Sequence, residues 1–328
     1  MRKRLSVALR FTIGFFLAFQ ALSASAADPV RVGVLKFGTV NWELKSMQHH
    51  GLDQANGFDL EIVPFAGGDA TRIALLGKEV DIIVSDWLWV SRQRAEGRNL
   101  TFVPYSSSVG AIMVPPDSDV NSLADLTGKS IGVAGGPLDK SWLLLQGMAR
   151  QEFDFDLAAD NDIVFGAPPL LAEKAKDGEL DAVLNYWHYC ARLEAEGFTR
   201  LVSAEEAAIA LGASGPVAAI GYVFDEQWAE DGKAAEFIRA SRQTKVIMNE
   251  SDDEWSRLAE SGAIKDKPEA LLVLRDRFRE GIPVRAHDEE VQDAALVFGL
   301  LGELGGAKLV GRSPVMTEGT YWSGAPLE

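Results

Sequence analysis

The sequence predicts an α/β protein of two lobes, each built on a mostly parallel sheet, with a ligand cleft between them. Strand-like apolar segments alternate with helical segments, which is typical of parallel sheets. Two extended segments, 111–118 and 212–224, interrupt this alternation and indicate crossovers between the lobes. We therefore expect residues 27–110 and 218–328, C-terminal helices included, to form lobe 1, and residues 111–217 to form lobe 2.

The individual elements follow from apolar periodicity and from glycines that end helices. In lobe 1 we expect helices at 41–50 and 87–96, and between them a short helix that Asp69 caps and that ends near Gly77. Strands are expected at residues 30–37, 58–65, 80–85 and 100–105 of lobe 1, and at 131–134, 162–165 and 180–185 of lobe 2, which the chain enters through the extended residues 111–114. The remainder is predicted to be an extended return segment at 217–224, then helices at 225–249, 252–261, 268–280 and 288–304.

Composition bounds the class of protein. A chain of 328 residues suits two ordinary domains, and 47% hydrophobic residues provide a sizeable core. The formal net charge of −16 disfavours nucleic acid and anionic membranes as partners. The single cysteine, Cys190, excludes an internal disulfide framework and a cysteine-cluster metal site, and we expect it to be a buried helical residue.

The N-terminus has the plan of a secretory signal peptide. Four cationic residues lie within the first ten positions, an apolar run at 11–19 follows, and Ala24-Ser25-Ala26 is a small-x-small cleavage site. The apolar run is too short for a permanent membrane-spanning helix. We expect residues 1–26 to be removed and the mature protein to be a soluble, periplasmic one.

One spacing pattern occurs in both predicted lobes. Asp81 precedes Trp87 by six residues, and Asp181 precedes Trp187 by six, with a glycine ending a helix before each pair. Repetition of this kind indicates that the glycine, the aspartate and the tryptophan have the same roles in both lobes. We expect the two aspartates to begin strands and to be structural, and the two tryptophans to lie where those strands end.

Strand ends matter because ligands of open parallel sheets bind outside the carboxyl ends of the strands. Trp87 and Trp187 would then flank one ligand from opposite lobes, although both could instead be core residues that cover sheet edges. Glycines at helix N-termini can offer backbone N–H groups to a ligand oxygen. The candidate ligand-binding residues all lie at such exits: Gly38, Thr39, Asn41, Trp42, Gly67, Gly68, Ser85, Asp86, Trp87, Ser107, Gly135, Gly136, Ser141, Trp142, Asn185, Tyr186, Trp187 and His188.

The side chains at these exits suggest a ligand chemistry. Tryptophans suit a flat ring or an organic cation. Acidic and aromatic residues together favour a ligand with N–H donors or a positive amine. The alternative role for the acids is helix capping, which we favour for Asp69 and Asp139, whereas for Asp86 both roles stay open. The charged residues in these loops are Glu43, Asp69, Asp86 and Asp139, with Lys36, Arg72 and Lys140 as the few bases.

The sequence offers no convincing catalytic or cofactor motif. His49 and His50 are adjacent on one predicted helix and cannot converge on a metal ion, and no phosphate-binding loop or nucleophile elbow is present. We expect no metal, no cofactor and no enzymatic activity. The alternative is an exported enzyme that uses the same cleft, for which Asp86 with His188 is the one acid–base pair available.

Four segments carry a resemblance to a known family: GKEVDII at 77–83, VPPDSD at 114–119, LADLTGKSIG at 123–132 and GELDAV at 178–183. With the signal peptide, this order resembles the solute-binding proteins of ABC importers of the nitrate/sulfonate/taurine and thiamine-precursor type. The resemblance covers nearly the whole mature chain.

The resemblance implies the type II periplasmic-binding fold, whose lobes close on a ligand and deliver it to the permease and ATPase subunits of an importer. It implies a monomer that is not an enzyme, with ligand contacts at the strand exits named above. The acidic, bulky Asp86–Trp89 segment departs from the small pair usual in the family and disfavours a bare anion. We expect a flat-ring or amine compound, with an organosulfonate held by backbone N–H groups as the close alternative and a sensory role as a further one.

Overall fold

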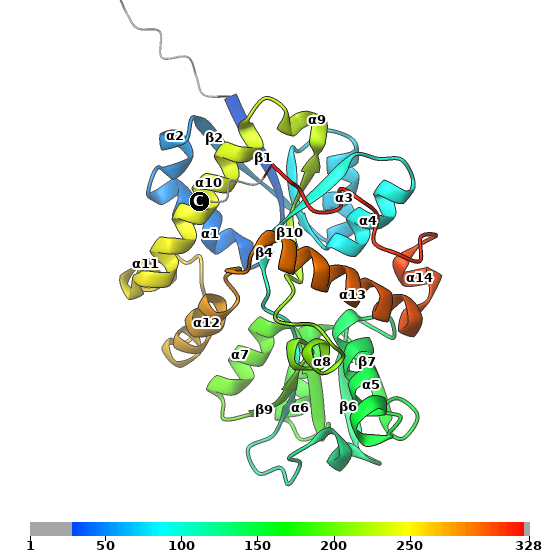
Figure 1. The fold of residues 1–328 in the computed structure, drawn as a ribbon. Coiled ribbons are helices and arrows are strands. Elements are labelled where there is room, and N and C mark those ends of the chain that lie inside the picture. The colour runs from blue at the N-terminus through cyan, green and yellow to red at the C-terminus, as the bar shows by residue number, and fades with distance from the viewer. Residues whose placement is uncertain (1–27, 325–328) are drawn as a thin grey trace, which may run out of the picture.

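The computed structural model describes residues 28–324, so the predicted signal peptide at 1–26 lies outside the described residues. Two lobes lie one above the other, each built on a five-stranded sheet, which confirms the predicted fold class (Figure 1). Within residues 28–324, no helix is both long and apolar enough to cross a membrane.

The first sheet has the order β2-β1-β3-β10-β4. Strand β1 pairs in parallel with β2 and β3, whereas β10 runs antiparallel between β3 and β4. Valines 30, 32 and 34 of β1 are buried, because a strand covered on both faces is apolar along its length. The strands are β1 (Asp28–Leu35), β2 (Phe58–Phe65), β3 (Ile82–Ser85), β4 (Leu100–Ser106) and β10 (Ile220–Asp225).

The second sheet repeats this topology in the order β7-β6-β8-β5-β9. Strand β6 pairs in parallel with β7 and β8, and β5 runs antiparallel between β8 and β9. Sequence analysis missed β9, because this five-residue strand is short and exposed or half-buried over its first three residues. The strands are β5 (Ala111–Val114), β6 (Ser130–Ala134), β7 (Asp162–Gly166), β8 (Ala182–Asn185) and β9 (Thr199–Ser203).

Helices connect the strands and cover the sheets. The helices of the first sheet's connections are α1 (Val40–His49), α2 (Leu52–Ala55), α3 (Gly68–Leu76) and α4 (Trp87–Ala95). Those of the second are α5 (Lys140–Phe153), α6 (Pro168–Lys176), α7 (Trp187–Ala195) and α8 (Ala204–Ala210), after the 3-10 turn η1 (Leu123–Leu126). The last part of the chain forms α9 (Glu226–Ala229), α10 (Lys233–Glu250), α11 (Asp252–Glu260), α12 (Pro268–Glu280), α13 (His287–Gly305) and α14 (Ala307–Val310).

The repeated aspartates have the same structural role in both lobes. The Asp81 carboxylate accepts the Arg31 backbone N–H at 2.8 Å and pairs with the Arg31 guanidinium. The Asp181 carboxylate accepts the Ser130 backbone N–H and hydroxyl, each at 2.8 Å. Each aspartate therefore ties the start of its own strand, β3 or β8, to the neighbouring parallel strand, β1 or β6, which explains why the spacing to the strand exit is the same in both lobes.

One capping assignment was wrong. Gly67, in extended conformation, is the N-cap of α3, and Asp69 lies inside the first turn. The Asp69 side chain is exposed and approaches Arg72 at 3.7 Å instead. A glycine is a tolerated N-cap, and an acidic residue in the first turn is favourable through the helix dipole, so both positions suit a helix start.

The C-terminal helices contact both lobes, whereas we expected them on lobe 1. Helix α12 packs on α7, and α13 packs on α5 and lies between the lobes (Figure 1). Glu290 of α13 accepts the Ala218 N–H at 2.7 Å, and Asp293 accepts the Ser214 N–H at 2.9 Å. Two acidic side chains of α13 thus hold the return crossover.

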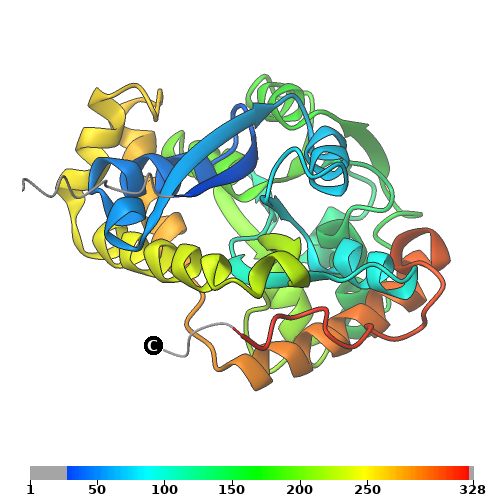
Figure 2. The same ribbon diagram turned by 90° about the horizontal axis from the view of Figure 1, so that it is seen from above.

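The last described residues lie beside the edge of the first sheet. Thr320 and Trp322 form backbone hydrogen bonds with Phe102 of the edge strand β4. Figure 2 shows this last segment (red) running alongside α13 (orange). The outer edge of β4 is therefore paired at Phe102.

In the structure the first crossover is the segment 107–110 between β4 and β5, earlier in the chain than the predicted 111–118, and it approaches the end of α12 very closely. A Cβ atom on Gly281 would lie 1.8 Å from Ser108 Oγ and 2.9 Å from the Ser108 backbone nitrogen. The Ser107 N–H donates to the Gly281 carbonyl at 2.9 Å. Only a residue without a side chain allows this contact between α12 and the crossover.

Gly281→Ala should therefore destabilise the protein by about 1–3 kcal/mol, because the clash involves backbone atoms that cannot rotate away. Urea unfolding followed by circular dichroism measures the loss. Gly299→Ala is the matched control, since a Cβ on Gly299 of α13 meets open space and should leave stability equal or up to about 1 kcal/mol higher. Equal stability of the two variants would contradict this account of the crossover.

Candidate ligand-binding cleft

The carboxyl ends of the two sheets face each other. Asp86, at the exit of β3, lies across the cleft from Lys140, which follows the exit of β6, with Oδ2 and Nζ 3.8 Å apart. Trp42 of α1 meets Trp187 of α7 edge to face, with ring centroids 6.1 Å apart. The strand exits named from the sequence are therefore brought together from both lobes.

Asp86 is both a helix cap and a cleft residue. Its Oδ1 accepts the Trp89 N–H at 3.0 Å and caps α4, while its Oδ2 faces Arg72 Nη2 at 3.1 Å. Burial acts to raise the pKa of the Asp86 carboxyl, but Lys140, Arg72 and the Trp89 N–H together hold this pKa below its ordinary value. Asp86 is therefore a carboxylate at neutral pH, and the two roles left open by the sequence coexist.

Arg72 is fixed within the first lobe. Its Nε and Nη2 donate to Ser85 Oγ at 3.2 and 3.1 Å, and its guanidinium lies over the Trp89 ring at 5.0 Å. The buried Ser85 thus orients Arg72 rather than pointing to the cleft as a free hydroxyl. Arg72 in turn holds the Asp86 carboxylate.

The second lobe brings an acid and an exposed ring to the same region. Asp139 caps α5 by accepting the Trp142 N–H at 3.1 Å, as predicted, and burial raises the pKa of its carboxyl. The Tyr186 side chain is 41% exposed. Its hydroxyl and Asp139 Oδ2 both lie close to Gly135, within 3.3 Å of where a Cβ would stand. The left-handed φ of +96° at Gly135 makes that approach possible.

The glycine loops differ in geometry. Gly136 also has a positive φ, of +141°, whereas Gly67 is extended and Gly68 begins α3. Nothing lies within 4 Å of a Cβ built on Gly67, Gly68 or Gly136. These three positions leave room beside the backbone for a ligand group.

At the exit of β1 the turn is held by its own residues. Asn41 Nδ2 donates to the carbonyl oxygens of Leu35 and Gly38 at 2.9 and 2.7 Å. Asn41 is thereby occupied, and Thr39 is the half-buried N-cap residue of α1. Sequence reasoning left Phe37 out of the site, although its side chain is 90% exposed beside Gly38. An apolar residue in a loop gives no sequence signal of exposure.

The tryptophans at the exits are all buried. Trp87 donates its Nε1–H to the Ala218 carbonyl at 3.1 Å and packs near Phe298 of α13. Trp187 packs on Trp42 in a separate apolar cluster, and Trp142 is inside the second lobe. Burial of Trp87 and Trp187 gives both a packing role, so their flanking of a ligand stays a prediction.

The remaining candidates at the exits of β4 and β8 are largely engaged with the protein itself. Asn185 is buried, donates to the Pro168 carbonyl at 2.8 Å and accepts the Tyr186 N–H. Ser107 contacts the Gly281 carbonyl. These two residues position the loops of the cleft.

His188 lies beside Trp187 and Tyr189. Its Nδ1 is buried and has no hydrogen-bond partner among residues 28–324. Burial lowers the pKa of His188 to about 3, and nearby Arg192 adds to this effect. The imidazole is therefore neutral, and the partners recorded for Asp86 are Arg72, Lys140 and Trp89, so the suggested Asp86–His188 pair is not assembled.

Glu43, grouped with the cleft acids from the sequence, lies elsewhere. It is fully buried and pairs with Lys245 Nζ at 2.5 Å. Tyr222 and Ser241 also donate to its Oε1, at 2.7 and 2.5 Å. A buried carboxylate needs such partners, and this set ties α1 to α10 inside the first lobe.

Two pockets lie between the lobes. One, of about 70 Å³, is lined by Trp87, Lys140 and Ser141 together with the return crossover and α13. The other, of about 310 Å³, is lined by Ser107, Trp187 and charged residues of α8 and α12. Residues 28–324 hold no group of three or more His, Cys, Asp or Glu side chains placed to bind one metal ion.

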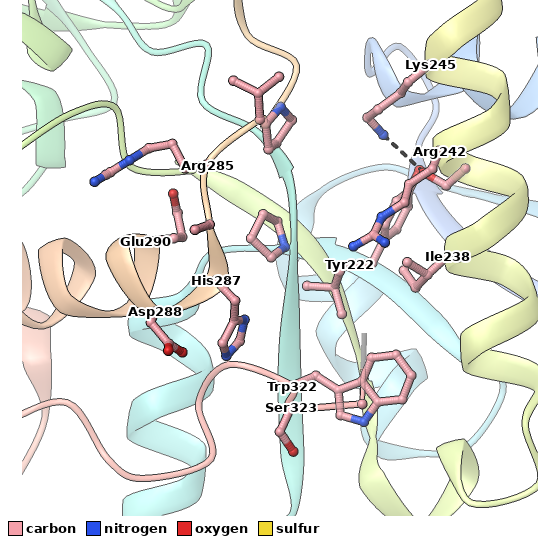
Figure 3. A pocket seen from close by; sticks show the side chains of 17 residues that line it. Tyr222, Ile238, Arg242, Lys245, Arg285, His287, Asp288, Glu290, Trp322 and Ser323 are labelled. Atoms are coloured by element: carbon pink, nitrogen blue, oxygen red, sulfur yellow. Dashed lines mark hydrogen bonds between the residues drawn. The ribbon is translucent and has the colours of Figure 1, made fainter. Parts of the chain in front are cut away.

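A larger pocket, of about 1080 Å³, was not predicted. It lies on the β4 edge of the first lobe, between α10 and the segment that leads into α13 (Figure 3). Basic residues line it, but Lys245 is paired with Glu43 and Arg285 with Asp293 at 2.8 Å. Packing of the C-terminal segment creates this pocket, and a sequence gives no signal for it.

Residues 46–249 match the model of the family described as NMT1/THI5 like. The chain belongs to the NMT1/THI5-like family. No curated protein matches the sequence. Among solved structures, the alkanesulfonate-binding protein SsuA of Xanthomonas axonopodis pv. citri, bound to MOPS, is similar to this NMT1/THI5-like protein with a TM-score of 0.64 at 18% identity, over 91% of this chain and 99% of the other.

Two further structures have the same fold as this NMT1/THI5-like chain. The periplasmic aliphatic sulphonate binding protein SsuA of Escherichia coli gives a TM-score of 0.65 at 19% identity, over 92% of this chain and 96% of its own. An ABC transporter structure from Parabacteroides distasonis gives 0.68 at 14% identity, over 89% and 98%. At these identities the likeness establishes the two-lobed fold.

The burial of Trp87 and the partial exposure of Tyr186 predict losses of different size in the free energy of unfolding when each ring is removed. Trp87→Ala should cost about 3–5 kcal/mol, because it removes a buried ring between the return crossover and α13. Tyr186→Ala should cost about 1 kcal/mol or less, because Tyr186 is 41% exposed and less packing is lost. Urea unfolding of both variants tests this, and equal losses would show that the packing described for Trp87 is wrong.

Proposed function

We propose that this protein is the solute-binding component of an ABC importer. It captures a small organic molecule between its two lobes and delivers it to a membrane permease and its ATPase. The observation that carries the proposal is that the strand exits of both lobes meet, through Asp86 with Lys140 and Trp42 with Trp187. Family membership and the likeness to binding proteins of importers support it.

Capture requires the lobes to move. We propose that residues 28–110 and 218–324 move as lobe 1 against residues 111–217, with the two crossover segments as the hinge. The space beside Trp87 is only about 70 Å³, so an organic molecule that reaches Lys140 and Ser141 there enters an open form. Closure then buries it, to the extent that it binds the closed form better than the open one.

The geometry favours binding over catalysis. The acid–base pair suggested by the sequence is not assembled, and Asp86 is held as a paired carboxylate. His188 has a pKa of about 3 and is a poor base for chemistry at neutral pH. We therefore propose that the bound compound leaves the protein unchanged.

The location and partners follow from the same proposal. The signal-peptide plan of residues 1–26 supports export to the periplasm, where a binding protein meets its permease. The protein would act as a monomer. Its ligand is a flat-ring or amine compound, or an organosulfonate such as those that the Xanthomonas and Escherichia proteins are described as binding.

Native mass spectrometry of the purified protein tests capture. We expect one small molecule per chain, released intact on gentle denaturation. Ser141→Trp should abolish or strongly reduce its retention, because Ser141 lines the space between the lobes and an indole would fill it. Ser256→Trp, on the exposed face of α11, is the matched control and should retain the molecule.

The same spectra can contradict the proposal. Conversion of the bound molecule into a different compound during incubation would indicate an enzyme. Equal retention by wild type and a folded Ser141→Trp variant would show that the molecule binds outside the cleft. Melting temperatures of both variants establish that they are folded.

A further inference from the structure

We propose that Asp86 is the specificity-determining residue of the cleft, that it selects ligands carrying a protonated or quaternary amine, and that Lys140 is an internal counter-ion which such a ligand displaces. The inference rests on the proposed function and names the chemical class of the ligand. It is carried by the difference between the two cations that face Asp86.

Arg72 is a permanent partner of Asp86. It belongs to the same lobe, donates to Ser85 through two nitrogens and lies over the Trp89 ring. Its Nη2 is at hydrogen-bond distance from Asp86 Oδ2, 3.1 Å. Opening of the lobes leaves all of these contacts in place, because every one of them is internal to lobe 1.

Lys140 faces Asp86 only while the two lobes are close together. It comes from the opposite lobe, its side chain is 37% exposed, and its Nζ is 3.8 Å from Asp86 Oδ2, beyond hydrogen-bond distance. A lysine on a flexible stem that reaches solvent can leave an ion pair at little cost. When the lobes open, Asp86 keeps Arg72 and loses Lys140, so one side of a buried carboxylate becomes available.

The surroundings of that vacated side suit a cation. The Asp86 carboxylate stays ionised, and Asp139 lies at the facing exit of the second lobe. Tyr186, 41% exposed, lies near Asp139 and presents an aromatic ring. Carboxylates with an aromatic face are the usual elements of ammonium recognition. The net charge of −16 draws cations to the protein as a whole.

The rival arrangement is an anion held between Arg72 and Lys140. In that arrangement Lys140 is a ligand contact, and the ligand places a second negative charge beside Asp86. The two arrangements therefore predict opposite effects of removing the Lys140 charge. Lys140→Met keeps the length of the side chain and decides between them.

Binding is measured by calorimetry with two cations, tetramethylammonium and benzylammonium, and two anions of matched size, methanesulfonate and benzenesulfonate. We expect wild type to bind a cation and Lys140→Met to bind it up to about fivefold more tightly, because a competing cation is gone. Asp86→Asn should weaken binding at least about tenfold, while the amide still caps α4.

Lys129→Met is the matched control, because Lys129 pairs with Asp119 at 3.6 Å at the other end of the second sheet, and it should bind as wild type does. Binding of a sulfonate that Lys140→Met weakens would overturn the inference and leave the proposed function standing. Unchanged cation affinity in Asp86→Asn, or no cation binding even in Lys140→Met, would also overturn it. Failure of the proposed function shows separately, as a chain that retains no small molecule between its lobes.

Discussion

The contact between Asp86 and Lys140 exists because the carboxyl ends of the two sheets are held face to face. Both sheets have four strands in one direction and one antiparallel strand, and the antiparallel strands β5 and β10 are those that follow the crossovers. Each crossover thus turns the chain round as it enters the other lobe. The loops after β1, β3, β6 and β8 meet as a result. The side chains that contact each other across the cleft, Asp86 with Lys140 and Trp42 with Trp187, come from these loops or from the helices that follow them.

The C-terminal helices α12 and α13 add packing contacts and ion pairs that hold the two lobes together. Helix α12 packs on α7, where Arg277 pairs with Glu194 at 2.8 Å, and Asp266, in the segment before α12, pairs with Arg192 at 2.6 Å. Helix α13 packs on α5 and binds the return crossover through Glu290. Both ion pairs are half-buried, and parting of the lobes would return their charges to water, where hydration offsets the attraction that is lost. They can therefore hold the lobes together and still allow them to part.

Much of the fold could be predicted from the sequence because its signals are local. Apolar runs, glycines and the repeated aspartate-to-tryptophan spacing located most strands, and Asp81 and Asp181 bind the strand starts as expected. The roles within the cleft depend on long-range packing instead. The burial of Trp87 comes from α13, and the pairing of Glu43 comes from α10, which lie far along the chain.

The partners of charged residues were the least predictable feature. Asp86 could be a cap or a cleft residue from its position alone, and it is both, because one oxygen meets the Trp89 N–H and the other meets two cations. Asp69 and Asp86 both follow a strand at the start of a helix, yet only the second acts as a cap. Which lysine meets which carboxylate across a cleft is decided by how the lobes sit together.

Hydrogen exchange of the protein with and without its bound small molecule tests the central claim most directly, because it reports both lobes at once. The account predicts slower exchange on binding at residues 36–42, 85–89, 135–142 and 185–189, which belong to the strand exits of both lobes. Residues 283–290, beside the large pocket at the β4 edge, should be unchanged. Protection confined to one lobe, or to residues 238–245 and 283–290 around that pocket, would contradict a ligand site between the lobes.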